Sequence, residues 1–69
     1  MPHAVLVRRP GNYRDPNPRP LAVDLPGLAA ARRLAMRLAK SYPLHGCHET
    51  GVFWFRDRDG LVEIWPEAQ

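Results

Sequence analysis

The segment from Asp24 to Pro43 constrains the fold most strongly, because it has the spacing of one amphipathic helix of about four turns. Its apolar residues recur at intervals of three and four and share one side of a helical wheel. They are Leu28, Ala31, Leu34, Ala35, Leu38, Ala39 and Tyr42. Asp24 is placed to act as the N-cap, Pro26 suits the first turn, and Pro43 stops the helix. Three of the seven inward residues are alanine, so we expect the helix to lie close against a sheet.

The opposite side of this helix is basic. Arg33, Arg37 and Lys40 follow one another at spacings of four and three, with Arg32 beside them, and we call Arg33, Arg37 and Lys40 the basic ridge. Residues 26–43 carry three Arg and one Lys without an acid, whereas residues 1–25 sum to +2 and residues 44–69 sum to −3. Such a face is most often simply solvated, but it also permits a phosphate-rich partner.

Extended segments flank the helix. Residues 3–9 predict a first strand, and the unbroken apolar run Ala4–Val7 favours a central or doubly covered position. Residues 10–20 hold four of the eight prolines and predict a loop. A short strand is expected at residues 21–23, and the polar, glycine-containing residues 44–51 predict a surface loop.

The last third of the chain predicts a hairpin, with strands at residues 52–56 and 61–65 and a turn that contains Asp59 and Gly60. A two-residue loop places Phe55 opposite Ile64, and a four-residue loop places it opposite Val62. In both cases Phe53, Phe55, Val62 and Ile64 share one side. Val52, Trp54, Arg56, Glu63 and Trp65 share the other. We expect Pro66 to end the strand and residues 66–69 to be frayed.

These elements predict a single α+β domain over residues 1–69, with the order β-β-α-β-β and one helix on one face of a mostly antiparallel sheet. A chain of 69 residues buries only about 60% of its unfolded surface, so a partner subunit would add stability. Its single cysteine, Cys47, permits no internal disulfide and fits a reducing compartment. No stretch is long enough to span a membrane, and we expect a cytoplasmic protein without a membrane partner.

Two tryptophans, Trp54 and Trp65, fall on the sheet face away from the helix, with Arg56 beside them and Arg58 near the turn. The proline-rich loop with Tyr13 could cover them, a second copy could pack on them, or they could form an open platform for a ligand. We therefore expect a non-enzymatic interaction module that binds itself or another protein through this face. The alternative is an accessory nucleic-acid binder that uses the basic ridge. No small-molecule substrate can be identified.

His45, Cys47 and His48, followed by Glu49, place four potential metal ligands within five residues. Structural zinc sites usually take ligand pairs from separate segments, so a polar loop is the favoured interpretation and no metal or cofactor is expected. Cys47 and His48 are adjacent, and adjacent side chains diverge. The sequence therefore predicts no catalytic residues.

The segment from Phe55 to Val62, FRDRDGLV, follows an Ala/Arg-rich helix. In this it resembles short bacterial domains of uncharacterised function that end in an Arg-Asp-Gly hairpin. The resemblance covers the hairpin and, loosely, the helix. It implies the ββαββ arrangement and supplies neither an activity nor functional residues.

Overall fold

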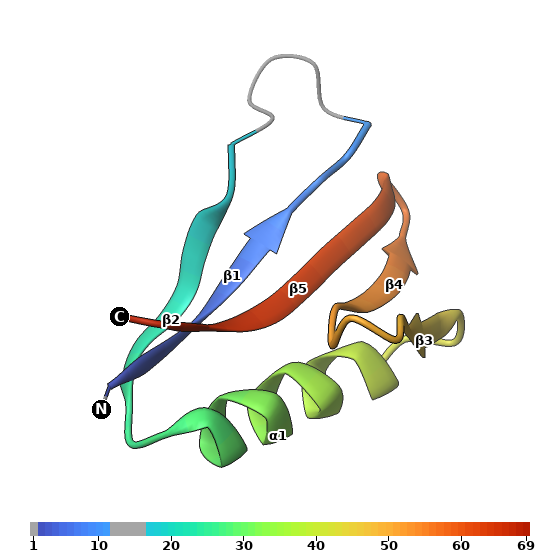
Figure 1. Cartoon of the computed structure of the whole chain (residues 1–69). Coiled ribbons are helices and arrows are strands. Elements are labelled where there is room, and N and C mark those ends of the chain that lie inside the picture. The colour runs from blue at the N-terminus through green and yellow to red at the C-terminus, as the bar shows by residue number, and fades with distance from the viewer. Residues whose placement is uncertain (1, 12–16) are drawn as a thin grey trace.

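The structure is a computed structural model that describes residues 2–11 and 17–69. Its elements are β1 (His3–Arg8), β2 (Arg19–Leu25), α1 (Leu28–Lys40), β3 (His45–Cys47), β4 (Phe53–Asp57) and β5 (Gly60–Ala68). The five strands of the described ranges form one antiparallel sheet in the order β2-β1-β5-β4-β3, and α1 covers one face of it (Figure 1). The predicted α+β class is confirmed. The apolar run of the first strand favoured a central or doubly covered position, and β1 is an interior strand between β2 and β5, whereas β5 is the central one.

The core lies between α1 and the sheet. Ala31, Ala35 and Ala39 are fully buried on the inner side of the helix, as their spacing predicted. They pack against apolar side chains of three strands, namely Val5, Phe53, Phe55, Val62 and Ile64. Tyr42, just beyond the helix, stacks on Phe55 with ring centroids 4.2 Å apart. The small alanine side chains let the helix backbone approach the aromatic floor of the sheet.

The helix begins later than the sequence predicted. Strand β2 continues through Asp24 to Leu25, because the Leu25 side chain packs against the core and the Asp24 amide donates to Gln69 Oε1 at 2.7 Å. The prediction of Asp24 as the N-cap is therefore wrong. Gly27 occupies that position without a side-chain cap, and its carbonyl accepts from the Ala31 amide at 3.1 Å. Leu28 was expected to face inward, but in the first turn, beside the loop before β4, it is 51% exposed.

The hairpin takes the second of the two predicted registers. Phe55 lies opposite Val62 and Phe53 opposite Ile64, which puts all four side chains in the core. The pairing continues to Asp57 and Gly60, so residues 58–59 alone form the turn. Gly60 has a φ of 121°, a backbone conformation that favours glycine.

The chain does not end its last strand at Pro66. Strand β5 runs on to Ala68 beside the start of β1, and the Gln69 amide donates to the Pro2 carbonyl at 3.0 Å. This bond directs the Gln69 amide toward the β1 side of the sheet. Backbone groups alternate in direction along a strand, so the nitrogen of Pro66 points to the β4 side, where β4 has already ended. The missing N–H of Pro66 therefore costs no ladder bond, and residues 66–69 are paired rather than frayed.

Two predicted loops are shorter than expected. Strand β2 already begins at Arg19 and includes Pro20, so it takes the last two residues of the predicted proline-rich loop. Residues 45–47 form strand β3 on β4, although they were expected to lie in a loop. Their sequence is too short and polar for a strand pattern, and the pairing partner decides the structure.

Candidate functional site

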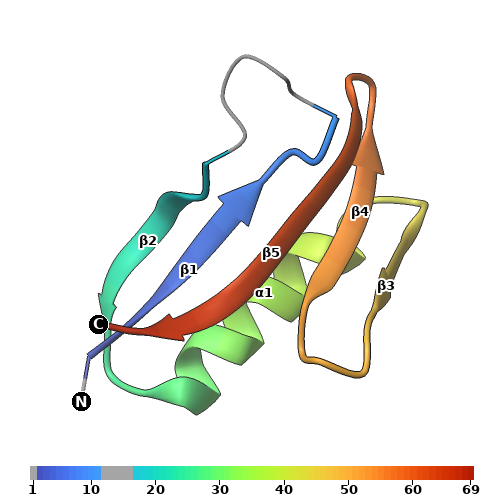
Figure 2. The same ribbon diagram turned by 45° about the horizontal axis from the view of Figure 1, so that its top comes forward.

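The sheet face opposite α1, which we call the open face, carries an apolar row across three strands. Figure 2 turns this face toward the reader, with α1 behind the sheet. Leu6 of β1 lies opposite Pro20 of β2 on one side and opposite Trp65 of β5 on the other. Facing residues on neighbouring antiparallel strands point to the same side of the sheet. Pro20, Leu6 and Trp65 therefore form one continuous row, which we call the apolar row.

Trp54 lies in the next row of the open face, between Glu63 and Gly46. Its indole ring occupies the space above Gly46, where a Cβ atom would lie 2.6 Å from Nε1. Any side chain at position 46 would displace the ring. Gly46 is thus required by the close approach of Trp54, and the ring in turn covers the glycine of a short edge strand.

Charged side chains surround the two tryptophans and pair with one another. Arg8 donates two hydrogen bonds to Glu63 Oε1, at 2.6 and 3.2 Å, and its guanidinium lies 5.6 Å from the Trp65 ring centroid. The Trp65 Nε1 atom donates to Glu67 at 3.0 Å. Both indoles are half-buried, and these contacts hold Trp65 in place.

The structure places the predicted binding residues in two groups. Trp54, Trp65 and Arg56 share the open face, as the hairpin alternation predicted, and Arg58 lies in the turn. Sequence reasoning missed Leu6, Pro20 and Arg8. The unbroken apolar run in residues 4–7 does not show which face Leu6 takes, Pro20 fell in the predicted loop, and only the strand order places β1 between β2 and β5.

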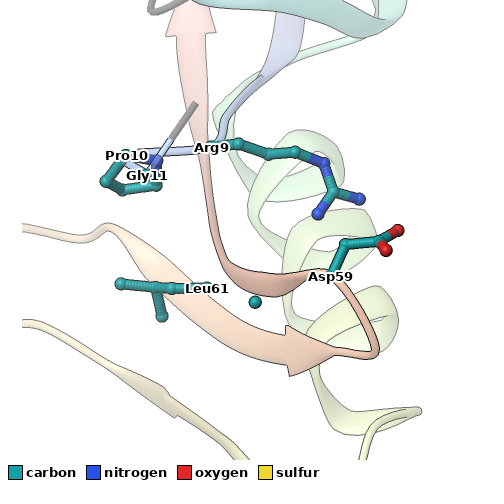
Figure 3. Close-up of a pocket in the computed structure, with 6 residues that line it drawn as sticks. Arg9, Pro10, Gly11, Asp59 and Leu61 are labelled. Carbon is teal, nitrogen blue, oxygen red and sulfur yellow. The ribbon is translucent and has the colours of Figure 1, made fainter. Parts of the chain in front are cut away.

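A second possible site is an open hollow of about 480 Å³ at the tip of the hairpin. Figure 3 shows Arg9, Pro10 and Gly11 on one side of it, with Asp59 and Leu61 on the other. The Arg9 guanidinium already donates two hydrogen bonds to the Asp57 carboxylate, at 2.7 and 3.2 Å. The hollow therefore presents a ligand with the Asp59 carboxylate and apolar walls, which are too few groups for specific binding.

A third feature runs along α1, past the start of β4 and the edge strand β3, and only the smaller of its two hollows is lined by β3 residues. Two shallow hollows, of about 170 and 320 Å³, share Met36 and Phe53 as walls. We call them together the α1–β3 groove, defined by Arg32, Arg33, Met36, Lys40, Cys47 and Phe53. The basic ridge residues Arg33, Arg37 and Lys40 are all exposed, and Arg33 and Lys40 line these hollows.

Strand β3 separates the residues with metal-ligand chemistry. His45 and Cys47 lie opposite Phe55 and Phe53 and so face α1, whereas His48 Nε2 lies 3.8 Å from Glu63 on the open face. The Tyr42 carbonyl accepts from His45 Nδ1 at 2.8 Å, and the His48 carbonyl accepts from Cys47 Sγ at 3.3 Å. Over residues 2–11 and 17–69, no three His, Cys, Asp or Glu side chains are grouped to hold a metal ion.

Comparison of the chain with protein-family models, with curated proteins and with solved structures finds no match. The resemblance to bacterial domains with an Arg-Asp-Gly hairpin stays a prediction. Tyr13, which belongs to the loop named as one of three alternatives for covering or using the tryptophans, lies outside the described residues. In the part of the chain that the structure describes, no helix has the length and apolar character needed to cross a membrane.

Proposed function

We propose that this protein is a non-enzymatic interaction module that self-associates through the open face. The observation that carries the proposal is the apolar row of Pro20, Leu6 and Trp65 on a sheet face that α1 does not cover. Aromatic side chains are enriched at the centres of protein interfaces. A chain of this length has a small core, and a second copy over the apolar row would enlarge the buried apolar surface.

The charges favour the open face over the helix as the surface that meets a second copy. Around the tryptophans, the open face carries two positive side chains, Arg8 and Arg56, and two negative side chains, Glu63 and Glu67. Two such faces meet around a two-fold axis without net repulsion. Two helices that each present Arg32 and the basic ridge would instead bring like charges together.

The geometry also weighs against the nucleic-acid alternative. Binding of a single strand gains most where bases stack on aromatic rings while basic side chains neutralise the phosphates. Here the tryptophans lie on the open face, whereas the basic ridge belongs to α1, which covers the other face of the sheet (Figure 1). We place the module in the cytoplasm, because a reducing compartment preserves an exposed free thiol such as that of Cys47.

Light scattering over a dilution series tests the proposal. We expect a dimer mass at high micromolar concentration and a monomer mass after dilution. Leu6→Lys introduces a charge into the apolar row and should give a monomer throughout, while its methylene chain still covers the strand. Met36→Lys adds the same charge on the helix and should leave the dimer intact. A monomer mass for the unmodified protein, or a Leu6→Lys variant with unchanged mass, would contradict the proposal.

A further inference from the structure

The two edges of the sheet differ in how well they could accept another strand. Edge strand β2 contains Pro20, which has no amide hydrogen, and its pairing with β1 shifts register twice. Asp24, near its end, has a φ of 57° and interrupts the extended backbone. Proline and bulges are features that block strand addition. The other edge, β3, carries none of them over residues 45–47.

The backbone of β3 has outward-facing hydrogen-bonding groups. Leu44 accepts from the Arg56 amide at 3.0 Å, and His48 donates to the Val52 carbonyl at 2.8 Å. In an antiparallel ladder, alternate residues point their N–H and C=O groups to the same neighbour. Leu44, Gly46 and His48 therefore point to β4. The N–H and C=O groups of His45 and Cys47 point away from the sheet.

The α1–β3 groove lies on the side to which a new strand would direct its side chains. Residues opposite His45 and Cys47 on an antiparallel strand would face α1, as those two residues do. There the smaller hollow, of about 170 Å³, is lined by Met36, Ala39 and Phe53 and has room for one aliphatic side chain. Met36 is 39% exposed, so the hollow is open to solvent.

The rim of the groove determines the charge of its ligand. Arg32 and Arg33 line the larger hollow and Lys40 lines the smaller one, and no acidic side chain is among the described residues that line them. In the described ranges these three side chains form no ion pair. We propose that the α1–β3 groove binds an extended acidic peptide, which adds to β3 as an antiparallel strand and inserts an aliphatic side chain beside Met36.

Other occupants use less of this surface. A second copy joined through β3 would bring two basic helices together, which like-charge repulsion opposes. A nucleic acid would contact Arg32, Arg33 and Lys40, but it would leave the apolar hollow and the outward N–H and C=O groups of β3 unused. The acidic peptide uses all three features.

The test uses a short peptide in which Leu alternates with Asp, titrated into the isotope-labelled full chain and followed by amide resonances. We expect shifts at His45, Cys47 and Met36 that weaken with added salt. If Leu faces the groove, the Leu amides face β3 and the Asp amides face solvent. N-methylation of the Leu amides should abolish binding, whereas N-methylation of the Asp amides should leave it intact.

A protein variant gives a second measure of the same contact. Met36→Asp puts a negative charge into the hollow on an exposed helix position and should weaken binding about tenfold. The Leu6→Lys variant should bind the peptide normally while losing self-association, which separates this inference from the proposed function. Equal binding of the two methylated peptides, or shifts confined to the open face, would overturn it. So would an oligonucleotide of deoxythymidine that binds while the peptide does not.

Discussion

Asp57 joins two parts of the chain that are distant in sequence. Its carboxylate accepts two hydrogen bonds from Arg9, which follows β1, and one from the Asp59 amide in the hairpin turn at 2.9 Å. The Arg9 hydrogen bonds are the main cause that lowers the pKa of Asp57 from 3.8 to about 2. The spacing of residues in the hairpin could not predict this pair, because Arg9 lies 48 positions away from Asp57.

The Asp57 carboxylate makes the free energy of unfolding depend on pH in the acid range. Because its pKa is lower in the folded state than in the unfolded chain, its contribution is complete above about pH 3.8 and is lost as the pH falls toward about 2. We expect Asp57→Asn to unfold with a flatter pH dependence in this window. Asp59→Asn, which keeps the Arg9–Asp57 pair, serves as the control. Equal slopes for the Asp57→Asn variant and the unmodified protein in acid titrations followed by circular dichroism would refute this role.

Gly46 illustrates a site residue that local pattern cannot identify. Its neighbours are polar, and their pattern predicts a loop. The structure shows that glycine is needed because the Trp54 indole lies where a side chain would be. That requirement comes from the pairing of β3 with β4 and is not encoded in residues 44–51 alone.

Among the elements, α1 depends on its three inward alanines. Ala35 is fully buried against the sheet, so Ala35→Leu adds three carbon atoms where no space exists and should lower the free energy of unfolding by about 1–3 kcal/mol. Ala29→Leu makes the same change at an exposed position and should have little effect. Urea denaturation measures both. Equal stabilities would show that the helix does not pack tightly on the sheet.

The elements that sequence predicted well are those specified by their own side-chain period. The inward alanines and the two faces of the hairpin follow from spacing, and Trp54 and Trp65 were placed on the correct face for that reason. The start of the helix, strand β3 and the end of β5 depend on remote partners. Gln69 holds the Asp24 amide, and β1 extends the ladder beyond Pro66. The apolar row likewise needed the strand order.

In the whole molecule, one helix on one sheet face produces two surfaces of different character. The open face is apolar at its centre, and its charges are balanced by pairs such as Arg8 with Glu63. The surface beside α1 is basic, and its charged side chains have no acidic neighbour lining the α1–β3 groove among the described residues. Self-association and capture of an acidic peptide therefore make separate use of the fold and can be removed by separate variants.

Tryptophan emission with acrylamide quenching, recorded across a dilution series, reports directly on whether Trp54 and Trp65 lie at the contact between two copies. If the open face self-associates, emission is blue-shifted and protected at high concentration and becomes redder and more easily quenched on dilution. The Leu6→Lys variant then shows the red, accessible emission at every concentration. Emission and quenching of the unmodified protein that do not change with concentration would contradict self-association through the open face.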